Sequence, residues 1–130
     1  MIVVDSSALV AISLLEVEAA GFTAMIQSAT GPRVSTANVL ETLMVLDGRN
    51  GADNRPEVLA MIELLGLQIE PVTTRQVWLA HDAFRHFGKG FHPARLNFGD
   101  CFAYALAREL DMPLLFKGDD FPLTDIRPAI

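Results

Sequence analysis

The sequence has little of several things, beginning with cysteine: Cys101 is the only one among 130 residues. A single cysteine excludes an intramolecular disulfide and any zinc site built on several thiolates, and it favours a reducing compartment such as the cytoplasm. Long hydrophobic runs are also missing, because no apolar stretch approaches the roughly 20 residues that a membrane span needs. The run Ile2–Val4 meets Asp5 without a basic segment before it, so we expect no secretory signal peptide.

Positive charge is scarce as well. Ten Lys and Arg residues stand against sixteen Asp and Glu, which gives a formal net charge of −6. Taken alone, this balance disfavours nucleic acid as a partner, because phosphate binding needs positive charge. Apolar residues make up 51% of the chain and charged residues 20%, which excludes a disordered tail. The length predicts one domain, residues 1–130, that is large enough to bury a core.

Several catalytic motifs are absent too. The chain contains no Gly-x-x-x-x-Gly-Lys loop, no Gly-x-Gly-x-x-Gly after its first strand and no Gly-x-Ser-x-Gly elbow. His81, His86 and His92 have no Cys or Glu at the spacing that zinc ligands adopt. The candidate chemistry therefore rests on carboxylates.

What the chain does have is an alternation of short apolar runs with longer helical patterns. Strands are predicted at residues 2–4, 33–35, 67–70 and 113–116, with a last short one from Ile126. Helices are predicted at residues 8–12, 16–29, 36–47, 57–65, 74–87 and 99–110. Strands separated by helices indicate the α/β class, with a central parallel sheet of four to five short strands and helices on both faces.

Acidic residues follow two of the predicted strands. Asp5 comes directly after the first strand, and Asp119 and Asp120 come after the strand at 113–116, beyond a turn at Gly118. In an open parallel sheet, ligands bind beyond the carboxyl ends of the strands. These carboxylates are therefore candidates for a site, although turns favour aspartate in any case.

Two further acids belong to predicted helices. Asp100 lies in the first turn of the helix at 99–110, where it either complements the helix dipole or ligates a cation. Glu41 lies at the margin of a largely apolar helix, either on a solvated flank or pointing into a cleft, where a cation would offset its desolvation. Four acids without His or Cys favour a hard cation, Mg²⁺ or Mn²⁺, and phosphodiester hydrolysis is chemistry that such an ion supports.

Three segments of the chain resemble the PIN-domain ribonucleases, specifically the VapC-type toxins of prokaryotic toxin–antitoxin pairs. They are the start Met-Ile-Val-Val-Asp-Ser-Ser-Ala-Leu, the stretch Leu-Asn-Phe-Gly-Asp-Cys-Phe-Ala-Tyr-Ala-Leu-Ala at 96–107, and Leu-Leu-Phe-Lys-Gly-Asp-Asp-Phe at 114–121 followed by Thr-Asp-Ile. The resemblance extends over essentially the whole chain and implies a single PIN-like domain.

The resemblance also implies roles for particular residues. It assigns the catalytic acids to Asp5, Glu41, Asp100 and Asp119, with Asp5, Asp100 and Asp119 as the metal ligands. Asp119 is preferred as the fourth acid because it directly follows Gly118, and Asp120 remains the alternate or neighbouring ligand. A hydroxyl beside the first acid is expected from Ser6 or Ser7, with Thr124 as a further candidate.

The function implied is that of a Mg²⁺- or Mn²⁺-dependent endoribonuclease, with one or two ions. The partners implied are RNA, a VapB-type antitoxin whose tail covers the pocket, and a second copy of the chain. One alternative is a PIN-fold protein that acts mainly as a binding partner in a complex. Another is a receiver-like signalling domain with an acidic pocket. Such a domain needs a phosphorylatable Asp after a central strand, but in this chain Val34 is followed by Ser35.

The stretch 75–95 has the opposite charge balance to the chain. It carries the basic residues Arg75, Arg85, Lys89 and Arg95 against one acid, Asp82. Setting the four site acids aside leaves a net charge of −2, so part of the negative balance belongs to the expected site. We therefore expect RNA to approach along the side of residues 75–95.

Overall fold

A sheet of four short parallel strands forms the centre of the computed structural model, which describes residues 1–130. The strands lie in the order β3-β2-β1-β4. Their bounds are β1 (Val3–Val4), β2 (Arg33–Ser35), β3 (Gln68–Glu70) and β4 (Leu114–Leu115). This arrangement confirms the predicted α/β fold with a parallel sheet.

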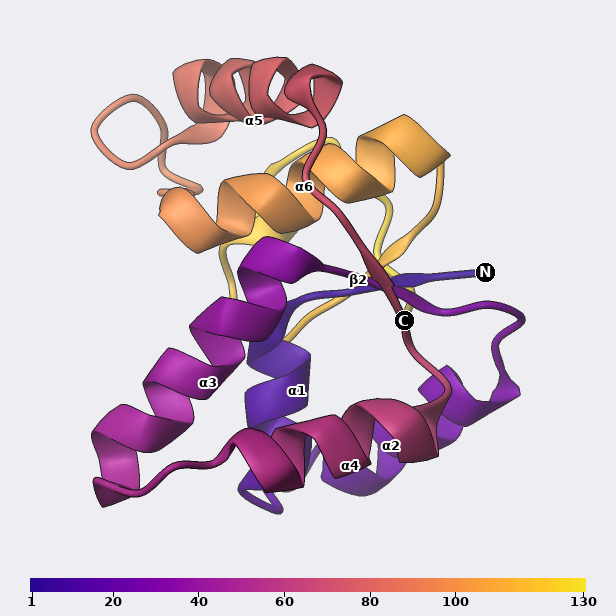
Figure 1. The fold of residues 1–130 in the computed structure, drawn as a ribbon. Helices are drawn as coiled ribbons and strands as arrows, with labels where there is room; N and C mark the ends of the chain where they lie inside the picture. Colours follow the sequence, from indigo (N-terminus) through magenta and orange to yellow (C-terminus); the bar gives the residue numbers. More distant parts are fainter.

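Helices cover both faces of the sheet (Figure 1). They are α1 (Ser6–Ser13), α2 (Ala19–Ser28), α3 (Thr36–Asn50), α4 (Arg55–Leu65), α5 (Thr74–Phe87) and α6 (Phe98–Leu110), followed by a 3₁₀ turn, η1 (Phe121–Leu123). Neighbouring strand residues point to opposite faces. Val4 and Leu115 therefore join a core with α1–α4, whereas Val3 and Leu114 join a second core with α5 and α6.

Side-chain caps explain where four of the helices begin. The side chains of Asp5, Ser35, Thr73 and Asn97 accept hydrogen bonds from backbone N–H groups in the first turns of α1, α3, α5 and α6. These bonds satisfy donors that have no partner inside the helix. Because Asp5 and Asn97 each sit at a helix start beside the same sheet edge, capping also fixes part of the candidate site.

Two predicted boundaries of helices were wrong by three residues, more than any other helix boundary. Helix α3 passes through Gly48 and ends at Gly51, whose φ of 68° is the left-handed cap conformation. A glycine inside a helix costs only about 1 kcal/mol, so it does not stop one by itself. Helix α2 begins at Ala19 and not at Glu16, because Leu15 adopts a φ of 54° and the chain turns before the helix starts.

The predicted last strand from Ile126 does not form. Residue Pro128 makes only an isolated parallel bridge to Leu114, flanked by two backbone hydrogen bonds. The neighbours of Pro128 make both bonds: the Leu114 N–H donates to the Arg127 carbonyl, and the Ala129 N–H donates to the Leu114 carbonyl.

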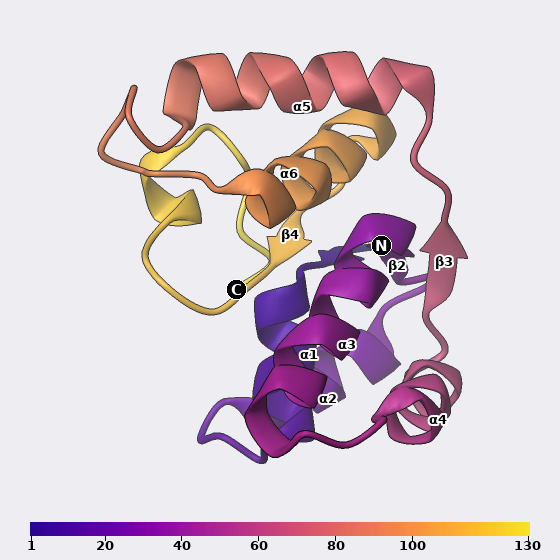
Figure 2. The same ribbon diagram turned by 60° about the vertical axis from the view of Figure 1, so that its left-hand side comes forward.

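Helices α5 and α6 run antiparallel and pack closely along one face (Figure 2). The loop between them, residues 88–97, therefore lies at the amino end of α6, while the start of α5 lies beside the carboxyl end of α6. No helix combines the length and the apolar composition that crossing a membrane requires.

Candidate active site

An open acidic cavity of about 460 Å³ lies where the carboxyl ends of β1 and β4 meet the amino ends of α1 and α6. Its lining contains the five acidic residues Asp5, Glu16, Glu41, Asp100 and Asp120. The lining also contains the polar residues Ser6, Ser7, Asn97 and Lys117, together with Gly118. Three of the four predicted acids thus share one cavity, although they are up to 95 positions apart in the chain.

Asp5 is buried, with 2% of its surface exposed, and it caps α1. Its Oδ2 accepts hydrogen bonds from the Ser7 backbone N–H at 3.0 Å and from Ser7 Oγ at 2.6 Å. Its Oδ1 is buried without any hydrogen-bond partner. Burial raises the pKa of Asp5 to about 6, and the nearby Glu41 carboxylate adds to the rise, while the Ser7 bonds oppose it.

Glu41 projects from α3, and two side chains hold its carboxylate. Ser6 Oγ and Asn38 Nδ2 both donate to Glu41 Oε1, the latter over 3.2 Å. Asn38 is fully buried and also donates to the Gly99 carbonyl at 3.0 Å. Asn38 therefore joins α3 to the first turn of α6 and fixes Glu41 between them.

Gly99 provides the space that this arrangement needs. A Cβ atom at position 99 would overlap all three terminal atoms of the Glu41 carboxyl group. The absence of a side chain therefore lets the carboxylate lie directly against the backbone of α6, beside Asp100.

Asp100 occupies the first turn of α6 and is held by a capping box. Its Oδ2 accepts from the Asn97 backbone N–H at 3.0 Å, while its own N–H donates to Asn97 Oδ1 at 2.9 Å. The pKa of Asp100 is raised to about 7, chiefly by burial and also by the charges of Asp5, Asp120 and Glu41, while the Asn97 bond opposes the rise. The carboxylates of this cavity therefore repel one another.

The loop after β4 differs from the expectation at the fourth acid. Asp120 lines the cavity and acts electrostatically on Asp100, whereas Asp119 does neither. Gly118 adopts a φ of 113°, so the chain turns sharply before the two aspartates. Thr124 also lies outside the cavity lining, because its hydroxyl donates to the Phe121 carbonyl and accepts from the Ile126 N–H within the turn.

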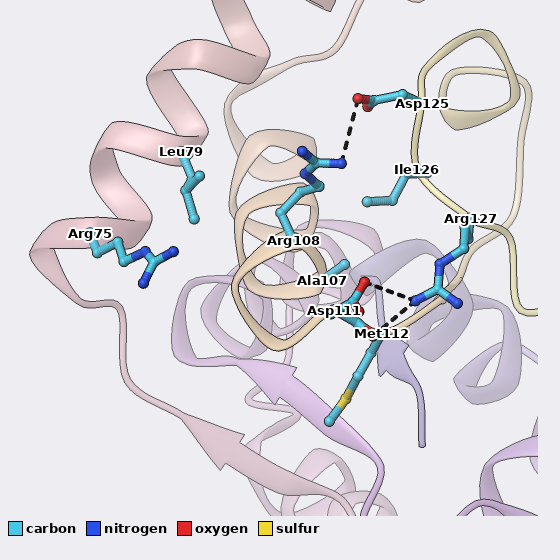
Figure 3. A pocket seen from close by; sticks show the side chains of 9 residues that line it. All are labelled: Arg75, Leu79, Ala107, Arg108, Asp111, Met112, Asp125, Ile126 and Arg127. Atoms are coloured by element: carbon cyan, nitrogen blue, oxygen red, sulfur yellow. Dashed lines mark hydrogen bonds and ion pairs between the residues drawn. The ribbon is translucent and has the colours of Figure 1, made fainter.

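The predicted RNA-binding residues do not all lie on the same side. Arg85, in the last turn of α5, stacks over the exposed Phe91 ring, and Lys89 and Arg95 belong to the loop that leads into α6. Arg75 lies at the other end of α5, roughly 15 Å from Arg85 along the helix axis. Figure 3 shows Arg75 beside the carboxyl end of α6, across a separate hollow from Arg108.

The donor set of the acidic cavity fits a hard, hydrated cation. Its carboxylate and hydroxyl ligands are all oxygens, and the buried, unpartnered Oδ1 of Asp5 offers a free acceptor. No three acidic, histidine or cysteine side chains converge closely enough to enclose an ion. Magnesium commonly takes only one or two carboxylates and keeps several waters, so this spacing suits it.

Sequence reasoning missed several residues of this site, among them Glu16, Asn38, Gly99 and Lys117. Asn38 precedes Glu41 by three positions, and that helical spacing places the two side chains on one face of α3. This is a signal that the sequence does contain. Gly99 and Lys117 gave no comparable signal, because their roles depend on contacts with distant parts of the chain.

Comparisons with known proteins agree with this architecture. The sequence profile of the family described as PIN domain matches residues 2–126. Ribonuclease VapC42 of Mycobacterium tuberculosis is 41% identical over 132 aligned residues, which cover 98% of each chain. Ribonuclease VapC28 of the same organism is 42% identical, over 98% of this chain and 97% of its own.

A solved structure shares the fold. The crystal structure of Mycobacterium tuberculosis VapC20, described as a sarcin-ricin loop cleaving toxin, matches with a TM-score of 0.75. The match covers 98% of this chain and 100% of that one, at 20% sequence identity.

Proposed function

Because the chain belongs to the PIN domain family and within it to the VapC ribonucleases, we propose that it is a metal-dependent endoribonuclease and the toxin of a toxin–antitoxin pair. The observation that carries the proposal is the meeting of Asp5, Glu41, Asp100 and Asp120 in one cavity at the carboxyl edge of the sheet. The receiver-like alternative has no support, since the family is a different one.

The proposed catalytic acids are Asp5, Glu41, Asp100 and Asp120, with Asp120 in the place first expected for Asp119. Asp5 and Asp100 are proposed to contact Mg²⁺ or Mn²⁺ directly, and Asp120 is proposed to bind it through one of the waters that the ion keeps. When bound, such an ion lowers the pKa of a coordinated water and offsets negative charge on the phosphate. Ser7 holds Asp5 Oδ2 and leaves Oδ1 free, while Ser6 and Asn38 orient Glu41 towards the same cavity.

The RNA backbone is proposed to cross the rim formed by the end of α5 and the following loop. Arg85, Lys89 and Arg95 are exposed there and lie at the end of α6 that carries Asp100. Arg75 is not part of this proposal, because it lies beside the opposite end of α6.

Two protein partners are also proposed. A VapB-type antitoxin is proposed to cover the acidic cavity. A second copy of the chain is proposed to bind an apolar surface of α3 and α6, which we call the α3–α6 patch; its residues are Leu40, Met44, Val45, Phe98 and Phe102. Val45 and Glu41 line both this patch and the cavity, so a homodimer would bring two acidic cavities close together.

The proposed activity is tested by incubating RNA with the purified protein and Mg²⁺ or Mn²⁺. We expect wild type to cleave the RNA and Asp100→Asn to lose the activity. Asp82→Asn is the matched control, because Asp82 is an exposed acid of α5 outside the cavity, and it should cleave as wild type does. Equal cleavage by wild type and Asp100→Asn would contradict the proposal.

A further inference from the structure

Lys117 is the one basic side chain that lines the acidic cavity, among five carboxylates. A substrate phosphate that enters this cavity meets strong repulsion from the carboxylates. A resident ammonium group reduces that repulsion and gives a direct partner for a phosphate oxygen.

The backbone of Lys117 is fixed to the first catalytic acid. Lys117 follows β4, and its N–H donates to Ser7 Oγ at 2.9 Å. Ser7 Oγ in turn donates to Asp5 Oδ2 at 2.6 Å. The Ser7 hydroxyl therefore fixes the backbone of Lys117 relative to Asp5, so the lysine side chain starts from a defined position at the cavity wall.

The side chain of Lys117 extends to the turn before α2. Its Nζ lies 3.2 Å from Glu16 Oε2 and 3.4 Å from Glu18 Oε1. These carboxylates raise the pKa of Lys117 above its ordinary value, so the group stays charged. The side chain is 36% exposed, and ion pairs with this much solvent contribute little to stability. An ammonium group has three donors, so it can bind a phosphate while it keeps or exchanges a carboxylate.

We propose that Lys117 is a catalytic residue that binds a non-bridging oxygen of the substrate phosphate at the rim of the acidic cavity. Its role is electrostatic, and the ammonium group keeps its protons throughout. The inference rests on the proposed ribonuclease function and adds to it a specific partner for the substrate. Glu16 and Glu18 hold the side chain at the rim until RNA arrives.

The test measures RNA binding as a function of salt. The probe is a short, fluorescein-labelled single-stranded RNA of mixed sequence, and the parent protein is Asp100→Asn with Mg²⁺, in which cleavage is suppressed. Adding Lys117→Met should weaken binding by about tenfold. It should also reduce the slope of log affinity against log salt by about 0.7, the value for one lost phosphate contact. Lys117→Arg keeps the charge and should retain the parent's slope.

The double variant Glu16→Gln with Glu18→Gln in the same parent is the matched control, because it removes both carboxylates that pair with Lys117 and keeps the ammonium group. If Lys117 binds phosphate, the double variant binds RNA at least as tightly as the parent. If the ion pairs are merely structural, the double variant weakens RNA binding, and that result overturns the inference even if Lys117→Met does not fold. An unchanged salt slope in folded Lys117→Met overturns it as well. Failure of the parent to bind RNA, with no cleavage by wild type, overturns the proposed function itself.

Discussion

At the scale of single residues, close approach and desolvation govern the acidic cavity. Glu41 lies against the backbone of Gly99, where its carboxylate accepts hydrogen bonds from Ser6 and Asn38. Asp5 is buried and Asp100 is half-buried; this burial, together with the neighbouring like charges, raises the pKa of both. In the absence of a cation, the repulsion between these carboxylates opposes folding. Carboxylates that share a site in this way are typical of functional centres.

Gly99→Ala should damage the site. The added methyl group overlaps the Glu41 carboxylate, so we expect a loss of about 1–3 kcal/mol in the free energy of unfolding, together with reduced RNA cleavage. Gly48→Ala is the matched control in α3, where nothing lies within 4 Å of the new Cβ. It should stabilise the protein by about 0.5–1 kcal/mol and leave cleavage unchanged. Urea unfolding and a cleavage assay measure both effects, and equal behaviour of the two variants would contradict the packing argument.

The raised pKa of Asp100 predicts a pH-dependent difference in stability between wild type and Asp100→Asn. The folded-state pKa of about 7 exceeds the ordinary value of 3.8, so the folded protein holds the extra proton between these limits. The contribution of Asp100 to stability is therefore full below about pH 4 and is lost as the pH rises through 7. In the presence of a chelator, Asp100→Asn should match wild type near pH 4.

Above pH 7 the same variant should be more stable than wild type by about 1–2 kcal/mol, after allowance for solvent screening. Thermal unfolding over a pH series measures the difference. Adding Mg²⁺ should stabilise wild type more than the variant. A difference in melting temperature that does not grow with pH would refute the assignment.

At the scale of elements, helix caps connect the local sequence to the site. Asn97 begins α6 and at the same time holds Asp100 through a capping box, whereas Thr73 begins α5 and contacts no site acid. The two caps are similar in chemistry. Substituting each in turn therefore separates the effect of a cap on stability from its effect on the site.

Asn97→Ala and Thr73→Ala should each lower the free energy of unfolding by about 1 kcal/mol. Only Asn97→Ala should lower RNA cleavage and weaken Mn²⁺ binding, because it frees the first turn of α6 that positions Asp100. Denaturant unfolding, cleavage and titration calorimetry with Mn²⁺ test this. If Thr73→Ala impairs cleavage equally, general loosening of the fold is the better explanation.

At the scale of the whole molecule, the sheet separates two cores and leaves an apolar surface beside the cavity. Met44 is 65% exposed and Phe98 is 81% exposed, although both belong to helices with buried opposite faces. An apolar surface of this kind next to a functional cavity indicates a site of protein contact.

Met44→Glu should convert the proposed homodimer into a monomer, because it places a charge in the α3–α6 patch. Leu64→Glu is the control, since Leu64 is 76% exposed on α4, outside the patch. Light scattering of the purified proteins measures the change. A monomeric wild type, or a dimer that persists in Met44→Glu, would contradict the placement of the second copy on this patch.

The sequence by itself determined the class of the fold and most of its elements, because apolar periodicity, caps and strand propensity act within a few residues. It also singled out Asp5, Glu41 and Asp100, since two of them stand at element boundaries and the third interrupts an apolar helix. Those signals are local. They did not reveal that the segment after Ile126 would make only the isolated bridge between Pro128 and Leu114.

Only the tertiary structure decided which residues share the cavity. The turn at Gly118 brings Asp120 and not Asp119 to the lining, and the antiparallel packing of α5 on α6 places Arg75 at the far end. Asn38 reaches Gly99 across 61 positions, and Lys117 reaches Ser7 across 110. Such contacts arise when separate elements pack on a common sheet, so no local pattern fixes them, and the chemistry of the cavity depends on them.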